Sequence, residues 1–421
     1  MQKYDLVVVG GGFAGVGAAI AAAEEGCRVL LVEQGNALGG AAVRALVNPF
    51  MCVGPHIEHE GGRVSAFGGI FRRIHNKLIE RGATSDIYGI SFLEEELKLL
   101  LNEAVLEVGV EILFHACLYN VSCENGNVKS ISLATRGGPL EIESDYFIDA
   151  TGDAQLAYLA GCPTLLGREG DNLCQPMTLC FRIGNVDMER YRKSEPRLKA
   201  EHAKALERGE LINPRENILT FGYPVGNVLH VNTTRVVKHN PTDPVELTGA
   251  ELIARRQVFE IYEFMKKHAE GLENSYIMST ASEIGVRESR KIVGDYVLTG
   301  EDCKACTKFE DAVTSCNYCI DIHNPEGKGT LIYELPKGEY FTIPYRCLIP
   351  KGVNNMLVAG RCISSDQMAQ SSFRIMPSVC CIGEAAGRAI GIAANSGVGV
   401  RAIDVAELQG KLKAKGSFVG V

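Results

Sequence analysis

The chain opens with two short apolar runs separated by a glycine-rich turn and an alanine-rich segment. Residues 6–9 and residues 29–32 contain only Leu and Val, which is typical of strands buried on both faces. The alanine-rich segment between them ends at Gly26 and has the length of a short helix. This order of strand, helix and strand predicts a βαβ unit at the start of the fold.

The turn between the first strand and the helix has the spacing G-x-G-x-x-G, with glycines at 10, 12 and 15. In a βαβ unit, Gly10 allows the tight turn, Gly12 lets a pyrophosphate approach the backbone, and Gly15 lets the helix pack on the strand. The helix N-terminus adds free N–H groups and a positive dipole end. Glu33 follows Gly15 by 18 residues, where an acid can bind a ribose. The pattern predicts a dinucleotide site; the alternative is a glycine-rich turn without a ligand.

The later pattern indicates two intertwined domains. Leu and Glu recur at helical spacing over residues 92–109, and a β-meander is expected over 110–148, with a hairpin turn at Asn125-Gly126. We therefore expect a dinucleotide-binding domain over residues 1–164 and again over 346–421. Residues 165–345 contain charged helices near 190–210 and 251–270, and we expect them to form an inserted substrate or cap domain.

Further motifs identify which dinucleotide is expected. The chain contains L-G-G-x-A at residues 38–42, D-A-T-G-D at 149–153, G-V-R-E-S-R at 285–290, D-I-H-N-P at 321–325 and R-x-M-P at 374–377. Together with the N-terminal turn, this set resembles a bacterial FAD-dependent oxidoreductase family with the glutathione-reductase-type FAD-binding fold, over nearly the whole chain. The resemblance implies an α/β fold. It combines a Rossmann-like FAD/NAD(P)-binding domain and β-meander with an inserted α+β substrate/cap domain.

The resemblance also implies which residues hold FAD. The expected set comprises the first glycine turn, the acid after the second strand, the second glycine pair, the small-residue turn near 150 and the C-terminal segment: Gly10, Gly12, Phe13, Ala14, Gly15, Glu33, Gln34, Gly39, Gly40, Ala41, Ala150, Thr151, Gly152, Asp153, Gly360, Arg361, Met376 and Gly383. The helix after Pro377 is expected to point its N-terminus at the flavin, where its dipole stabilises negative charge on the reduced ring.

Three side chains outside this set are candidates for catalysis: Arg287, His323 and Arg374. Arginines suit a substrate carboxylate, and a histidine suits proton transfer. The alternative for each arginine is a structural salt bridge, and Arg374 could act on the flavin electrostatically. His230 is a weaker candidate, and its alternative is a histidine of the cap domain whose hydrogen bonds are satisfied.

Two C-x-x-C pairs, Cys303/Cys306 and Cys316/Cys319, leave three alternatives open: a zinc or iron–sulfur site, a redox dithiol, and ordinary thiols. The leading hypothesis is hydride transfer between flavin and a small polar metabolite, either a carboxylate or a polyhydroxylated compound. The alternative is an electron-transfer flavoprotein that passes electrons through a Cys-ligated cluster to a protein partner. We find no second G-x-G-x-x-G on a βαβ unit, so the electron acceptor is expected to be external.

Charge, hydropathy and cysteine content limit the kinds of partner and the compartment that we expect for this protein. The net charge is −8 without a basic run, which argues against nucleic-acid binding. No apolar stretch has the length of a membrane span. The chain has 15 cysteines and no recognisable secretion signal, so we expect a cytoplasmic protein with mostly free thiols. A homo-oligomer remains open.

Overall fold

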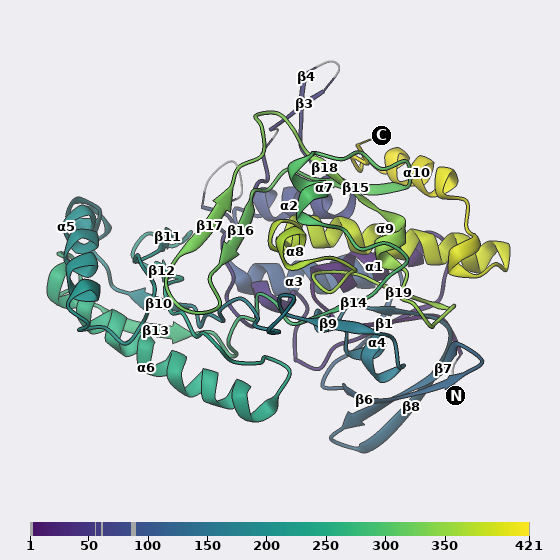
Figure 1. The fold of residues 1–421 in the computed structure, drawn as a ribbon, viewed down its shortest axis with the longest axis horizontal. Helices are drawn as coiled ribbons and strands as arrows, with labels where there is room; N and C mark the ends of the chain where they lie inside the picture. Colours follow the sequence, from purple (N-terminus) through teal and green to yellow (C-terminus); the bar gives the residue numbers. More distant parts are fainter. Residues whose placement is uncertain (1–2, 55, 60–61, 86–89, 421) are drawn as a thin grey trace.

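A seven-stranded sheet belongs to the larger part of the molecule and lies toward its lower right in Figure 1, in a computed structural model that describes residues 3–54, 56–59, 62–85 and 90–420. The strand order is β5-β2-β1-β8-β7-β6, and β19 also pairs with β8. These strands are β1 (Tyr4–Val9), β2 (Val29–Val32), β5 (Glu111–Leu113), β6 (Cys117–Glu124), β7 (Asn127–Thr135), β8 (Gly138–Asp149) and β19 (Met356–Val358). The predicted βαβ unit and β-meander are confirmed.

The long strand β8 joins two kinds of sheet. Its first half, Gly138 to Glu143, pairs with β7 in the antiparallel meander. Its second half, Ser144 to Asp149, runs parallel to β1, and the last three residues of β8 also run parallel to β19. Three strands that are distant in the sequence therefore end side by side, and the turns after β1 and β8 lie next to each other.

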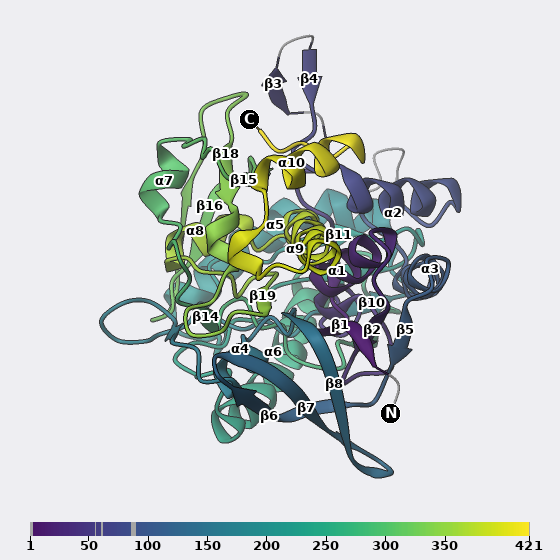
Figure 2. The same ribbon diagram turned by 90° about the vertical axis from the view of Figure 1, so that its right-hand side faces the viewer.

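Helices α1 (Phe13–Glu24) and α9 (Met376–Ser396) pack against each other beside this sheet, and Figure 2 shows them together at its centre. Small residues permit the close approach. A Cβ atom on Gly383 would lie 2.0 Å from the carbonyl oxygen of Ala14, and one on Gly387 would lie 2.1 Å from that of Ala18. Buried Arg388 on α9 also pairs with Glu24 and Glu25 at the end of α1. The two helix N-termini are thereby fixed relative to each other.

Other elements complete the larger body. Its helices are α2 (Gly69–Glu80), α3 (Glu94–Leu106), α4 (Gln155–Leu159), α7 (Gly300–Lys304), α8 (Gln367–Phe373) and α10 (Val405–Ala414). Four two-stranded sheets accompany them: β3 (Ile57–His59) with β4 (Gly62–Val64), β9 (Thr164–Leu166) with β14 (Arg290–Ile292), β15 (Ala312–Cys316) with β18 (Phe341–Pro344), and β16 (Ile320–His323) with β17 (Thr330–Tyr333). Among the described residues, no single helix is both long and apolar enough to cross a membrane. Helices α8 and α9 meet that test only as a pair, bent by 97°.

A smaller unit lies at the left of the molecule in Figure 1 and has its own apolar core. It consists of the sheet β11-β12-β10-β13 and two helices: β10 (Phe181–Gly184), β11 (Thr220–Gly222), β12 (Leu229–Val231), β13 (Tyr276–Thr280), α5 (Met188–Glu207) and α6 (Pro244–His268). The two predicted charged helices correspond to α5 and α6. Within the predicted segment 165–345, residues 177–284 build this second core, whereas buried residues from Ile292 to Ile343 join the larger one.

Candidate functional site

A cavity of about 890 Å³, called the main cavity below, lies between the larger body and the smaller unit. Its lining begins at the carboxyl ends of β1 and β8, includes the first turns of α1 and α9, and continues to the loop before β11 in the smaller unit. Ligands of open α/β sheets bind beyond the carboxyl ends of the strands. The position and the volume therefore suit an extended dinucleotide with a small molecule beside it.

The three glycines of the first turn meet different constraints. Gly10 has φ +107°, and a Cβ atom there would lie 2.4 Å from the carbonyl oxygen of Ala150. A Cβ atom on Gly15 would lie 1.8 Å from the carbonyl oxygen of Gly10. At Gly12 the nearest protein atom would be the Cα of Gly40, at 3.9 Å. The fold itself thus requires Gly10 and Gly15, whereas Gly12 faces open space of the kind that a pyrophosphate needs.

Glu33 lies at the end of β2, and its carboxylate is mostly occupied by protein donors. Its Oε2 accepts from the amide of Gly11 at 2.8 Å, and its Oε1 accepts from the amide of Gly35 at 2.6 Å and from Arg44 at 2.9 Å. A carboxylate has about four lone-pair positions, so one acceptor position remains for a ribose hydroxyl. Arg44 also pairs with Glu283 at 2.5 Å, which ties the glycine-rich loop to the segment leading to Arg287.

The turn after β8 is held by two aspartates. Asp149 is fully buried, and its carboxylate accepts from the amide and hydroxyl of Thr151 and from the amide of Ala157. Burial raises the pKa of Asp149. Asp153 accepts from Arg361 at 2.6 Å, so the turn after β8 is joined to the turn after β19. Both turns border the main cavity.

The N-terminus of α9 also borders the main cavity. Ile375, Met376 and Val379 line it, and among the residues that the structure describes no side chain caps this helix end. An uncapped N-terminus leaves backbone N–H groups available to a ligand and contributes a positive partial charge. This helix end therefore lies at the wall of the main cavity, and its orientation toward a flavin stays a prediction.

Nearly all of the predicted site residues lie on the main cavity. Arg287, His323 and Arg374 line it, as does every predicted FAD-binding residue other than Gly15 and Gly383. Gly15 packs against the carbonyl of Gly10, and Gly383 packs against α1 where the two helices cross. These two glycines are needed for the packing that shapes the site. Because they do not line the main cavity, the structure does not support a direct contact with a cofactor.

Three arginines line the main cavity, and two of them, Arg215 and Arg374, act on the charge of the third, Arg287; the three are called the arginine cluster below. Arg287 donates hydrogen bonds to the carbonyl of Pro176 and the hydroxyl of Thr178. Burial, together with Arg374 and Arg215, lowers the pKa of Arg287 to about 9. Arg215 is buried, and Arg287 and Arg374 are half-buried, so the cluster creates a partly buried, positively charged surface that suits an anionic group.

Arg215 was not among the residues predicted from the sequence. It lies in the loop before β11, is 5% exposed and donates from its Nε to Asn217 at 3.1 Å. Burial lowers its pKa. No motif marks this position, so only the three-dimensional structure brings Arg215 beside Arg287.

His323 is 7% exposed and both of its ring nitrogens have neighbours. Nδ1 lies 3.1 Å from Nη2 of Arg235, and because a guanidinium only donates, Nδ1 must accept. The proton of neutral His323 is therefore on Nε2, which lies 3.5 Å from the Asp321 carboxylate. Burial and nearby Arg287 lower the pKa of His323 to about 3. His323 is thus neutral near pH 7 and offers a hydrogen-bond donor, not a free base.

Asp321 completes this part of the site. Burial acts to raise its pKa, but the hydrogen bond from His323 and the charges of Arg374 and Arg287 outweigh burial and hold the pKa well below its usual value. Asp321 is therefore an anion at neutral pH, 3.9 Å from Arg374.

His230 provides a test of how the smaller unit responds to pH. The expectation that its hydrogen bonds are satisfied is wrong: His230 is buried, and within the described part of the chain neither ring nitrogen has a hydrogen-bond partner. Burial and Arg182 lower its pKa from 6.5 to about 3. Between these values the unfolded chain binds the extra proton, so stability falls as the pH drops below 6.5.

Between about pH 7 and about pH 5, protonation of His230 in the unfolded chain should lower the unfolding free energy of the wild type by about 2 kcal/mol. We expect His230→Leu to lack this part of the pH dependence. Urea midpoints of both proteins at the two pH values measure this difference. The matched control is His115→Asn at an exposed position, which should retain the wild-type difference. An unchanged pH dependence in His230→Leu would show that His230 is not the buried neutral group described above.

The cysteines do not assemble a metal centre in the described part of the chain, where no group of three or more Cys, His, Asp or Glu side chains is placed to hold an ion. Cys303 lies in α7, and Cys316 ends β15 with its Sγ 3.8 Å from the Ser372 hydroxyl. Burial raises the pKa of Cys316 to about 11 and that of Cys319 to about 12. Since metal ligation and disulfide exchange need a thiolate, this environment favours ordinary thiols.

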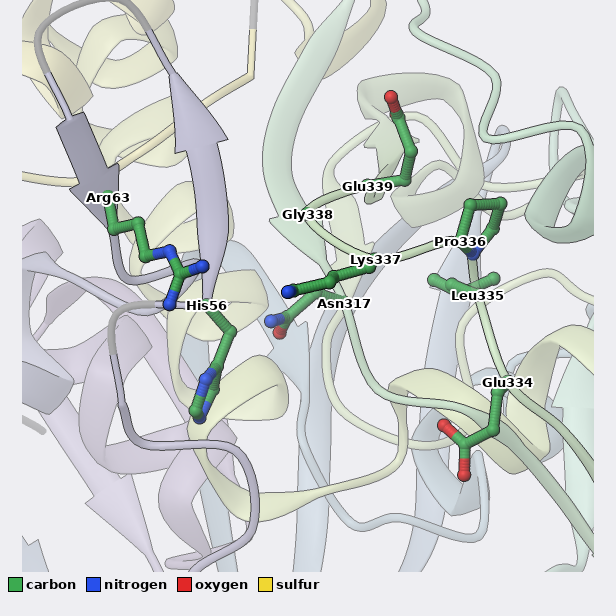
Figure 3. Close-up of a pocket in the computed structure, with 9 residues that line it drawn as sticks. All are labelled: His56, Arg63, Asn317, Glu334, Leu335, Pro336, Lys337, Gly338 and Glu339. Carbon is green, nitrogen blue, oxygen red and sulfur yellow. The ribbon is translucent and has the colours of Figure 1, made fainter.

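A second cavity, of about 210 Å³, lies between the β3–β4 hairpin and the loop at residues 334–339 (Figure 3). His56, Arg63 and Lys337 line it together with Glu334 and Glu339. Figure 3 shows the side chains of Arg63 and Lys337 directed into the space between hairpin and loop. Its volume is small for a ligand pocket and its lining has mixed charge, so it is not the candidate site.

Comparisons with known proteins agree with this geometry. A family model described as "FAD dependent oxidoreductase" matches residues 5–412. A search of curated proteins found no match. Among solved structures, a geranylgeranyl bacteriochlorophyll reductase-like protein from Thermoplasma acidophilum is 13% identical, with 98% of this chain and 83% of that chain covered and a TM-score of 0.48.

Two further solved structures have similar sequence identities and TM-scores. The myxobacterial chondrochloren halogenase CndH is 14% identical, covers 98% of this chain and 79% of its own, and has a TM-score of 0.49. The p-nitrophenol 4-monooxygenase PnpA from Pseudomonas putida DLL-E4 is 11% identical, covers 100% and 87%, and has a TM-score of 0.49. At these identities and TM-scores the three structures support no conclusion about this chain.

Proposed function

Because the chain belongs to the family of FAD-dependent oxidoreductases, we propose that it transfers a hydride between FAD and a small metabolite that carries a carboxylate. The proposal includes the glutathione-reductase-type arrangement of the FAD-binding part and a role for the smaller unit as a cap over the substrate. The observation that carries it is the arginine cluster, which lies in the same cavity as the dinucleotide-binding turns.

The residues of the main cavity fit FAD. The open space at Gly12, the remaining acceptor position on Glu33 and the uncapped N-terminus of α9 correspond to a pyrophosphate, a ribose and the flavin end, respectively. Thr151 and Arg361, on the turns after β8 and β19, line the wall between these points. When bound, FAD supplies a carrier for two electrons.

The protein side chains bind and orient the substrate in this proposal. Arg287 holds its position through Pro176 and Thr178, so its remaining N–H groups are available to a carboxylate. His323, with its proton on Nε2, and ionised Asp321 contribute a polar pair beside the arginines. A guanidinium cluster favours a carboxylate over an uncharged polyhydroxylated substrate, because burying unpaired cations costs free energy that an anion offsets.

The electron-transfer alternative has less support. It needs a Cys-ligated cluster, and the described cysteines form no such site. A redox partner outside the chain is still required, since the sequence holds one dinucleotide-binding turn only.

The test is an anaerobic titration of the purified flavoprotein with a panel of small carboxylic and polyhydroxylated compounds, followed through the visible flavin spectrum, with iron and zinc measured on the same sample. We expect a hydroxy or saturated carboxylate to bleach the flavin, or an unsaturated or keto carboxylate to reoxidise the reduced protein. A response to uncharged polyols alone would overturn the carboxylate, and flavin with stoichiometric iron would favour electron transfer.

A further inference from the structure

We infer that the substrate is a dicarboxylate, whose two acid groups are held together by Arg215, Arg287 and Arg374. This inference rests on the proposed function and deepens it by counting the charges at the arginine cluster. It concerns the chain's own residues and needs no position for the flavin.

The three guanidinium groups arrive from different elements. Arg215 lies in the loop before β11, Arg287 lies in the segment between β13 and β14, and Arg374 ends α8. Both Arg374 and Arg215 act on the charge of Arg287, and all three side chains line the main cavity. Three guanidinium groups that come from three elements offer more than one pair of N–H donors to a ligand in this cavity.

Protein carboxylates balance little of this charge. Within the part of the chain that the structure describes, neither Arg215 nor Arg287 forms an ion pair with a carboxylate, and their polar contacts are to an amide, a carbonyl and a hydroxyl. Arg374 has Asp321 at 3.9 Å. Three cations and one carboxylate leave an excess of two positive charges, because His323 is neutral.

The other carboxylates of the main cavity have partners elsewhere: Glu33 and Glu283 pair with Arg44, Asp153 pairs with Arg361, Glu216 pairs with Arg235, and Glu251 accepts from the amide of Ile284. Their charges are therefore used in ion pairs and hydrogen bonds that stabilise the walls of the cavity. A ligand is the remaining source of negative charge for the arginine cluster.

A ligand with two negative charges balances the excess of two positive charges at the arginine cluster, whereas a ligand with one negative charge does not. Buried cations that repel one another are costly, and the lowered pKa of Arg287 reflects this repulsion as well as burial. One carboxylate satisfies one fork of N–H donors, whereas two carboxylates on a short chain satisfy two forks and leave no unpaired charge. Two anionic groups also explain why the cluster holds three arginines in place of one.

The experiment measures binding to the oxidised flavoprotein by perturbation of its visible spectrum. The probes are dicarboxylates from malonate to adipate, the monocarboxylates of the same chain lengths, and propyl phosphate. We expect the best dicarboxylate to bind at least about tenfold more tightly than its matched monocarboxylate, about 1.4 kcal/mol. Arg215→Gln should weaken the dicarboxylate at least about tenfold and the monocarboxylate less than about threefold, so that the preference collapses.

The control variant is Arg256→Gln, at an exposed position of α6, which should leave both affinities unchanged. Equal affinity for the monocarboxylate and every dicarboxylate would overturn the inference while leaving the proposed function intact. Tighter binding of propyl phosphate would overturn it in favour of two charges on one group. If no carboxylate of either kind binds, the proposed function itself fails.

Discussion

Replacing Gly12 by alanine is expected to weaken FAD binding at least about 100-fold while leaving the stability of the protein without FAD within about 1 kcal/mol of the wild type. Gly12 has φ −70°, so alanine adopts its backbone conformation without strain. Its Cβ atom would have no protein atom closer than 3.9 Å. The added methyl group would therefore occupy the space that the pyrophosphate needs, and only the ligand would be affected.

Gly15→Ala should behave in the opposite way and provides the internal comparison. Its Cβ atom would lie 1.8 Å from the carbonyl oxygen of Gly10, so α1 and β1 would have to separate. We expect this variant to lose stability even without FAD, by about 3 kcal/mol or more. Gly410→Ala, in open space on α10, is the control that should change neither property adversely.

The measurements are the FAD dissociation constant by flavin fluorescence and the urea midpoint without FAD. Retention of the wild-type FAD affinity in Gly12→Ala would show that the pyrophosphate does not pass over this turn. A large loss of stability in Gly12→Ala would instead assign the glycine to packing, as at Gly15.

The sequence predicted best those strands and turns that are determined by residues close together in the chain. Apolar runs with no polar interruption mark β1 and β2, and the Asn125-Gly126 turn marks the hairpin between β6 and β7. Boundaries were less accurate where a single residue decides them. The β-meander expected from residue 110 starts at Cys117 with β6, because β5 ends at Leu113 and pairs with β2, and His115, with φ +57°, breaks the extended conformation between them. The second charged helix starts at Pro244 and not near 251, because Asp243 accepts from the amides of Val245 and Glu246.

The site depended on contacts that the sequence does not encode locally. Arg287 and Arg374 lie in motifs, but Arg215 lies in an irregular loop that is positioned from a distance, through the ion pair of its neighbour Glu216 with Arg235. The spacing of the two C-x-x-C pairs is compatible with a metal centre, yet Cys316 is fixed by β15 and by contact with Ser372, and Cys303 is fixed by α7. The spacing of cysteines along the chain therefore indicates which residues could be metal ligands, whereas the packing of helices and strands determines whether their side chains come close enough to bind one ion.

Replacing Arg287 by methionine is expected to lower kcat/KM at least about 100-fold, about 2.7 kcal/mol, for the carboxylate that reacts fastest in the panel proposed above. Arg287 belongs to the arginine cluster, and its contacts with Pro176 and Thr178 fix its guanidinium against the cavity wall. Methionine fills similar volume but offers no donor, so the substrate carboxylate would lose its partner. FAD binding should be unchanged, because neither contact involves the dinucleotide-binding turns.

Arg287→Lys separates the charge of this residue from its geometry. Lysine retains the positive charge but cannot form the two parallel N–H contacts of a guanidinium, so we expect a loss of only about tenfold. Flavin content and the urea midpoint of each variant establish that the protein is folded and loaded with FAD. If Arg287→Met retains kcat/KM within about threefold, the arginine serves to join Pro176 and Thr178, and substrate binding must depend on Arg215 and Arg374. If methionine and lysine lower kcat/KM equally, the expected tenfold loss for lysine is wrong, and the two parallel N–H contacts of the guanidinium matter more than its charge.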